Sequence, residues 1–120
     1  MSYVYLLHFE QPIAPGRHTT QHYIGKADDL AQRIAAHARG RYNGGGNGCA
    51  KLCAVAKGRG IGFRVVRVWR GGRALETRIK ARKNAPALCP ICGRGYALRD
   101  VEEIPAADIS RYLDGIEVRR

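Results

Sequence analysis

One carboxylate, Glu76, stands alone in a long basic stretch of the sequence. It is the only acidic side chain between Leu30 and Arg99. Breaking a phosphodiester requires an activated water and a cation that offsets the charge on the phosphoryl oxygens. A carboxylate is a good ligand for Mg²⁺ or Mn²⁺, because these hard cations prefer oxygen ligands. Glu76 is therefore a candidate ligand for such an ion; the alternative is a helix-surface ion pair with Lys80, four residues on.

Arg33 and His37 are one helical turn apart, so both side chains can point at the same phosphate. A guanidinium group binds phosphate oxygens in pairs and keeps its charge, whereas histidine can donate a hydrogen bond or exchange a proton near neutral pH. The two residues predict a phosphate contact and a proton-transfer group. The alternative is a solvated helix face with a histidine at its edge.

Tyr5 and Tyr23 lie in two segments typical of β-strands, and their side chains could meet across a sheet. A phenol beside an activated water can relay or accept a proton. The alternative is packing alone, because aromatic residues favour strands and cross-strand pairs. Gly25 would let a phosphate or a backbone approach closely, unless it only serves the turn after the strand.

Three further polar residues are candidates for supporting roles. Lys26 could contact a phosphate or lower the pKa of a tyrosine, and its alternative is an ordinary surface lysine. Lys80 could contact a phosphate from the helix that carries Glu76. Asn84 could orient a catalytic group, and its alternative is a helix C-terminal cap before Ala85-Pro86.

The four cysteines form two pairs with the spacing of metal ligands. Cys89 and Cys92 frame a Pro-Ile dipeptide and precede a glycine, as in a zinc knuckle. Cys49 and Cys53 are four residues apart, which is one turn of a helix. Together they predict a structural Zn²⁺ held by four thiolates; the alternative for the helical pair is a buried place in the core.

The elements that must position these residues follow from apolar spacing and turn signals. Residues 3–9 and the run 22–25 predict two antiparallel strands joined by a loop. A helix with its apolar face toward the core follows, with Asp28 as the expected N-cap and Gly40 as the expected C-cap.

The second half of the chain continues this alternation. Residues 49–57 predict a second helix, residues 63–70 a strand, and residues 73–83 a third helix that stops before Pro86. A weaker helical pattern covers residues 106–113. The order β-β-α-α-β-α predicts an α+β fold, with a small mixed or antiparallel three-stranded sheet flanked by helices.

Composition indicates the class of partner. The formal charge is +11 and the pI about 10.1, with 18 Lys and Arg against 4 Asp and Glu in residues 1–99. Such a surface favours a polyanion, and nucleic acid is the expected partner. A membrane is not expected, because no amphipathic segment or long apolar run is present. The N-terminus lacks the features of a secretory signal, so we expect a cytoplasmic protein with reduced thiols.

Taken together, these residues resemble the ordered signature of the GIY-YIG nuclease family. The matching positions are Tyr3-Val4-Tyr5, Tyr23-Ile24-Gly25, Arg33 with His37, Glu76 and Asn84. The resemblance is greatest to small stand-alone bacterial and phage-type members that end in a Cys-Pro-x-Cys turn. One departure is Tyr3, which stands where the family name has glycine.

The resemblance implies a metal-dependent endonuclease that hydrolyses nucleic acid, and DNA is expected more than RNA. It implies one Mg²⁺ or Mn²⁺ on Glu76, phosphate contact by Arg33, Tyr5 as the general base or its partner, and Tyr23 as a residue that positions the water. His37 and Asn84 would support the site.

The expected organisation is a nuclease domain in residues 1–93 and an acidic extension in residues 94–120 that packs on it. Selectivity would then come from a homodimer, from a protein partner or from a special DNA structure. The rival interpretation is a zinc-stabilised nucleic-acid-binding module without catalysis. A third is a protein-interaction domain that uses the acidic residues 100–117.

Overall fold

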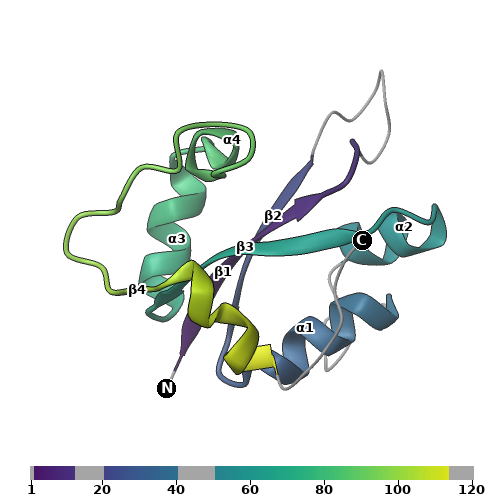
Figure 1. Cartoon of the computed structure of the whole chain (residues 1–120), viewed down its shortest axis with the longest axis horizontal. Helices are drawn as coiled ribbons and strands as arrows, with labels where there is room; N and C mark the ends of the chain where they lie inside the picture. Colours follow the sequence, from purple (N-terminus) through teal and green to yellow (C-terminus); the bar gives the residue numbers. More distant parts are fainter. Residues whose placement is uncertain (1, 13–20, 41–50, 114–120) are drawn as a thin grey trace.

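Strands and helices alternate along the chain in the computed structural model, which describes residues 2–12, 21–40 and 51–113 (Figure 1). The elements are β1 (Tyr3–Phe9), β2 (His22–Ala27), α1 (Leu30–Arg39), α2 (Lys51–Gly58), β3 (Phe63–Arg70), α3 (Arg73–Ala81), α4 (Ala85–Leu88), β4 (Glu103–Ile104) and the 3₁₀ helix η1 (Ala106–Leu113). The predicted order β-β-α-α-β-α is therefore followed by three short elements.

The strands form one antiparallel sheet in the order β2-β1-β3-β4. The central strand β1 pairs Tyr5 with Gly25 on one side and with Val68 on the other. The predicted α+β class is confirmed, but the sheet has four strands where three were expected. The additional strand β4 has only two residues, and a segment that short carries no alternating pattern in the sequence.

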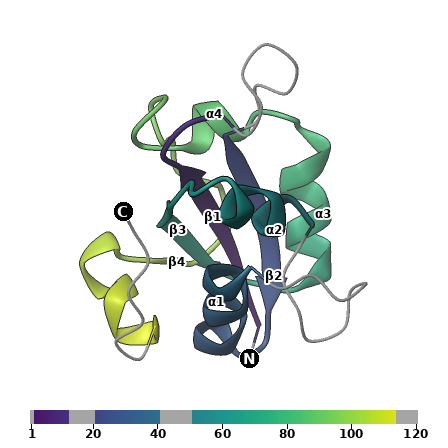
Figure 2. The same ribbon diagram turned by 90° about the vertical axis from the view of Figure 1, so that its right-hand side faces the viewer.

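The pleat of β1 divides the core into two layers, because successive side chains point to opposite faces. Tyr5, Leu7 and Phe9 belong to the layer covered by α1, α2 and η1. Val4 and Leu6 belong to the layer covered by α3 and α4. Figure 2 shows α1 and α2 in front of the sheet and α3 beyond β2. The same hairpin therefore supplies side chains to two separate environments.

Helix α1 begins one residue later than the predicted N-cap, Asp28, would place it. Asp29, not Asp28, is the N-cap, and its carboxylate accepts a hydrogen bond from the backbone N–H of Gln32 at 3.1 Å. Asp28 instead accepts a hydrogen bond from the Ser2 hydroxyl at 2.5 Å. Gly40 is the C-cap as predicted, with a φ of 71° that favours glycine.

Helix α3 ends at Ala81, two residues before its predicted end. Lys83 has a left-handed φ of 51°, which an α-helix cannot continue. Pro86 does not stop α3 but lies in the first turn of α4, where its missing N–H leaves no hydrogen bond unmade. The chain therefore turns sharply and starts a second, short helix.

The C-terminal segment is joined to the sheet through Arg67, which is 4 % exposed. Its guanidinium donates to both carboxylate oxygens of Glu103, at 2.8 and 2.5 Å. It also donates to the carbonyl oxygens of Leu88 and Tyr96, at 3.1 and 2.8 Å. These bonds satisfy a buried charge and fasten α4, the loop after it and β4 to β3.

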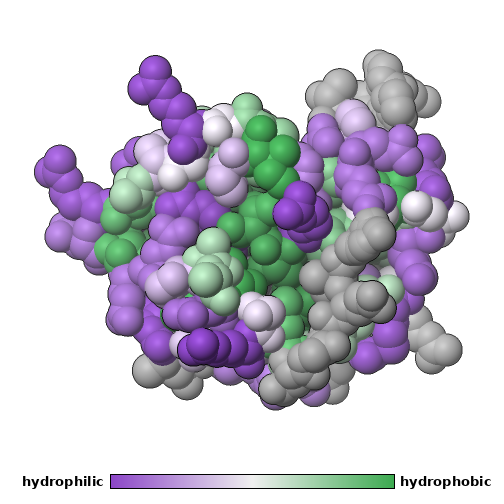
Figure 3. Space-filling model, in the orientation of Figure 1, coloured by the Kyte–Doolittle hydropathy of each residue, from purple (hydrophilic) through white to green (hydrophobic). Residues whose placement is uncertain are grey.

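Hydrophilic side chains cover the margins of the face shown in Figure 3, and apolar ones gather over the central sheet. Among the described residues, every helix is too short or too polar to span a bilayer.

Candidate active site and metal centre

Three rings from three elements meet beside the sheet. The Tyr5 hydroxyl on β1 lies 2.6 Å from Nε2 of His37 on α1, and both side chains are almost completely buried. The ring of Tyr23, on β2, lies 6.2 Å from the Tyr5 ring and 5.4 Å from the His37 ring, measured between centroids. We call Tyr5, Tyr23 and His37 the tyrosine–histidine cluster.

Burial keeps both members of the hydrogen-bonded pair neutral. It raises the pKa of Tyr5 well above its usual range, assisted by the negative charges that Tyr23 and Glu76 can carry and opposed by Arg33. Burial, assisted by the positive charge of Arg33, lowers the pKa of His37 to about 4. At neutral pH the Tyr5 hydroxyl can therefore donate to Nε2 of His37. Nδ1 of His37 then carries the ring proton, and it has no hydrogen-bond partner among the described residues.

Gly25 makes room for the cluster. It is paired directly with Tyr5 across the β1–β2 ladder. A Cβ atom at this position would collide with the Tyr5 hydroxyl and would lie 2.8 Å from the Tyr23 ring. The glycine thus serves the close approach expected from the sequence, but the group that approaches is the phenol of Tyr5.

Two opposite charges border the cluster. Arg33 of α1 acts electrostatically on both Tyr5 and His37, and Glu76 of α3 acts on Tyr5. The Glu76 carboxylate is 21 % exposed and lies 3.2 Å from the Lys80 ammonium, the helix pair that was its alternative. Lys80 also lies 5.8 Å from the centre of the Tyr23 ring.

Two predicted site residues lie away from the cluster. Lys26 alternates to the other face of β2 and lies 3.6 Å from the Asp28 carboxylate. Asn84 precedes α4 and donates its amide N–H to the Tyr96 hydroxyl, so it is not the cap of α3. Its Oδ1 atom is buried and has no hydrogen-bond partner in the described part of the chain.

A groove of about 380 Å³ runs beside the cluster, between β2 and the α3–α4 turn. Its polar and aromatic lining comes from His22, Tyr23, Lys80, Lys83 and Asn84. Tyr23 therefore belongs to both the cluster and the groove. We call this hollow the β2–α4 groove.

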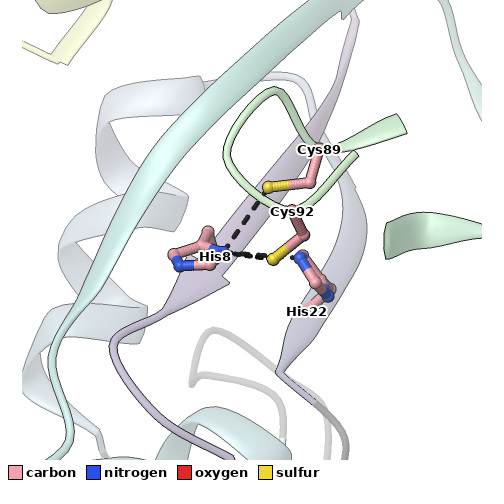
Figure 4. A group of neighbouring side chains, drawn as sticks. All are labelled: His8, His22, Cys89 and Cys92. Atoms are coloured by element: carbon pink, nitrogen blue, oxygen red, sulfur yellow. Dashed lines mark hydrogen bonds between the residues drawn. The ribbon is translucent and has the colours of Figure 1, made fainter. Parts of the chain in front are cut away.

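A second constellation lies on the other face of the sheet (Figure 4). His8 and His22 face each other across the β1–β2 ladder, with Nδ1 of His8 3.4 Å from Nε2 of His22. The sulfur atoms of Cys89 and Cys92 lie 3.5 and 3.6 Å from the same Nδ1 atom. One donor atom from each residue falls within 4.8 Å of the other three. We call these four residues the histidine–cysteine cluster; they could hold a metal ion.

The loop after α4 is shaped to present both sulfur atoms. The Gly93 amide donates to the Cys89 carbonyl at 2.8 Å, which closes a tight turn around Cys92. A Cβ atom at Gly93 would lie 2.5 Å from the Pro86 carbonyl oxygen, so only glycine lets the turn fold back on α4. Burial lowers the pKa of His8 and His22, which leaves their imidazoles neutral at pH 7. A neutral imidazole is the form that binds a metal ion.

This arrangement corrects the predicted set of zinc ligands. Cys53 is buried among apolar side chains in the layer beneath α1 and α2, on the opposite face of the sheet from Cys89. It therefore does not join the Cys89–Cys92 pair, and Cys49 lies outside the described residues. His8 and His22 were not among the predicted ligands. The signal was available, because the register that pairs Tyr5 with Gly25 also pairs these two histidines.

Comparisons of the chain with models of protein families, with curated proteins and with solved structures find no match.

Proposed function

We propose that this protein is a divalent-metal-dependent endonuclease that hydrolyses nucleic-acid phosphodiester bonds, most readily in DNA. The observation that carries the proposal is the 2.6 Å contact between the Tyr5 hydroxyl and His37, within the electrostatic reach of Arg33 and Glu76. These residues come from β1, α1 and α3, and the GIY-YIG resemblance assigns them roles in one site.

The neutral pair of Tyr5 and His37 can transfer a proton during hydrolysis. As a water attacks phosphorus, a new P–O bond forms and the bond from phosphorus to the leaving sugar oxygen breaks. The Tyr5 oxygen accepts a proton from the water while the Tyr5 hydroxyl passes its own proton to Nε2 of His37, and the leaving oxygen takes up a proton from solvent. Tyr5 thus avoids becoming a buried phenolate, which its raised pKa would oppose. His37 holds the proton only during the step, because its pKa of about 4 returns it to the neutral form at pH 7. Arg33 binds the non-bridging oxygens of the phosphate and stabilises the charge that builds up on them.

Glu76 suits a hard divalent cation. Its carboxylate is partly exposed, and a single carboxylate with water and phosphate oxygens is a common Mg²⁺ ligand set. The bound ion would supply Lewis-acid stabilisation of the phosphoryl oxygens. Lys80, which now pairs with Glu76, is free to contact a phosphate once an ion occupies the carboxylate.

The proposal includes a structural Zn²⁺ in the histidine–cysteine cluster. Two imidazole nitrogens and two thiolates are a common set of four zinc ligands, and His₂Cys₂ sites of this kind close the ion off from substrate. We propose a cytoplasmic location, where Cys89 and Cys92 stay reduced and available to the metal. A homodimer or a protein partner would supply selectivity that one small domain lacks.

A second candidate is a zinc-stabilised binding module that does not cut nucleic acid. The ion pair between Glu76 and Lys80 favours it, because that pair needs no catalytic ion to explain the carboxylate. Both candidates use the same basic surface for affinity. Only the endonuclease requires Glu76 for turnover.

The deciding experiment incubates the protein with supercoiled plasmid in Mg²⁺, Mn²⁺ or EDTA. Glu76→Gln and Arg33→Ala are tested beside the native chain. Glu102→Gln is the matched control, because Glu102 also forms a surface ion pair, at 3.2 Å from Arg70, but lies in the segment before β4. Metal-dependent nicking that is lost in the first two variants and kept in the control supports the endonuclease. Nucleic-acid binding without nicking by any form supports the binding module.

A further inference from the structure

The β2–α4 groove has the charge and shape of a place for part of a nucleic-acid chain. Its lining includes the ammonium groups of Lys80 and Lys83 and contains no Asp or Glu. Its volume of about 380 Å³ is in the range of pockets that enclose one small organic molecule, which is the scale of a nucleotide and far below that of a duplex.

The groups inside the groove suit an unpaired nucleotide. Tyr23 offers an aromatic ring for stacking a base, and the two lysines can contact the phosphates on either side. The buried Oδ1 atom of Asn84 lacks a hydrogen-bond partner among the described residues, while Nδ2 of the same amide is held by Tyr96. The Asn84 amide adds a polar group to the lining of the groove.

The two walls of the groove are both connected to the histidine–cysteine cluster. One wall is β2, and its residue His22 belongs to the groove lining and to the cluster. The other wall is α4, which begins beside Asn84 in the groove and ends directly before Cys89 in the cluster. An ion bound by the four donors would therefore join β2 to the loop that directly follows α4.

We infer that the β2–α4 groove binds one unpaired nucleotide of the substrate strand, and that Zn²⁺ on His8, His22, Cys89 and Cys92 holds its two walls in place. The inference rests on the proposed nucleic-acid substrate, and it makes single-stranded or distorted nucleic acid the preferred substrate class. Binding then depends on zinc, although zinc takes no part in bond cleavage.

Binding is measured by fluorescence anisotropy with a labelled single-stranded oligonucleotide and with a blunt duplex of the same sequence. The protein carries Glu76→Gln and the buffer lacks Mg²⁺, so cleavage does not interfere. Lys83→Ala is expected to weaken single-strand binding about tenfold and to lower its salt dependence by about one phosphate contact. Lys57→Ala, an exposed lysine on α2, is the charge-matched control and is expected to change affinity about twofold or less.

The zinc arm of the experiment measures metal content and affinity on the same samples. Cys92→Ser should lose zinc and single-strand affinity together, whereas Cys92→His should keep both because histidine is also a zinc ligand. Cys53→Ala, a buried thiol outside the cluster, should keep zinc and affinity. If Cys92→Ser does not fold, the native chain stripped of metal and titrated with Zn²⁺ gives the same comparison.

Three results would overturn the inference. The first is equal binding of single strand and duplex with Lys83→Ala no weaker than Lys57→Ala. The second is full single-strand affinity after zinc is lost. The third is a native chain that takes up no zinc. Failure of the proposed function is distinct from these outcomes, because it would appear as absent plasmid cleavage while zinc-dependent oligonucleotide binding persists.

Discussion

The two faces of the β1–β2 hairpin surround their histidines with different groups. On the α1 face, His37 is buried in the core beside Tyr5. Its Nε2 atom forms a short hydrogen bond with the Tyr5 hydroxyl, and its Nδ1 atom has no hydrogen-bond partner among the described residues. On the α3–α4 face, His8 and His22 lie at the end of the sheet, where two sulfur atoms approach them. Packing organises the first group, whereas the second has four donors and only weak contacts to hold them together. The difference predicts that the first group persists without metal and that the second needs an ion.

The largest expected effect comes from removing the ion of the histidine–cysteine cluster. When free Zn²⁺ exceeds its Kd a thousandfold, binding adds about 4 kcal/mol to the free energy of unfolding. Urea unfolding with and without added Zn²⁺ measures this difference. Cys89→Ser should abolish the response to Zn²⁺, while Cys53→Ala should lower stability and keep the response. If added Zn²⁺ does not change the free energy of unfolding of the native chain, the predicted difference between the two faces is wrong.

Removing one hydroxyl from the tyrosine–histidine cluster should affect cleavage far more than folding. Tyr5→Phe deletes the group that relays the proton, and we expect cleavage to slow by about 10²- to 10⁴-fold. Tyr3→Phe is the matched control on the same strand, because the Tyr3 hydroxyl accepts a hydrogen bond from Arg70 at 3.4 Å and has no role in the proposed proton transfer. Plasmid cleavage rates test the pair, and equal rates for both variants would contradict the proposed role of Tyr5.

The buried His37 should make stability depend on pH. Its pKa is about 4 in the folded protein and near 6.5 when unfolded, so the unfolded chain binds more protons between these values. The free energy of unfolding should therefore rise from about pH 4 to pH 6.5 and level off above, by at most about 3 kcal/mol.

His37→Gln should flatten this rise, and urea unfolding at pH 4.5 and pH 7 measures the change. His8 and His22, whose pKa values are also lowered, contribute a rise of the same sign. The quantity to compare is therefore the difference between the native chain and the variant. An identical pH dependence in both would refute the burial argument for His37.

The smallest expected effect is steric and confined to the tyrosine face. Gly25→Ala places a methyl group against the Tyr5 hydroxyl and should lower the free energy of unfolding by about 1–3 kcal/mol. Gly58→Ala is the control, since a Cβ there meets nothing within 4 Å. Thermal unfolding of the two variants gives the comparison. Zinc uptake by Gly25→Ala should be unchanged, because Gly25 lies on the face of β2 opposite the histidine–cysteine cluster.

The elements that were predicted correctly are those specified by residues close together in the sequence. The apolar run of β1 and the Gly40 cap of α1 follow from chemistry within a few residues, so these elements agree with the prediction. The two-residue strand β4 and the early end of α3 do not, because β4 exists only through pairing with β3 and the end of α3 depends on a left-handed turn at Lys83. Arg67 had no predicted role, since its partners Leu88, Tyr96 and Glu103 come from distant parts of the chain.

The sequence by itself determined which residues could do chemistry: a lone Glu76 in a basic chain, tyrosines on two strands and a Cys-Pro-Ile-Cys turn. Only the tertiary structure decided which of them meet. The strand pleat sends Tyr5 and His8 to opposite faces, and the fold-back after α4 delivers Cys89 to the histidines and leaves Cys53 in the other layer. Spacing along a chain limits local neighbours, whereas a metal site assembled from three segments depends on register and layer, which only long-range packing sets.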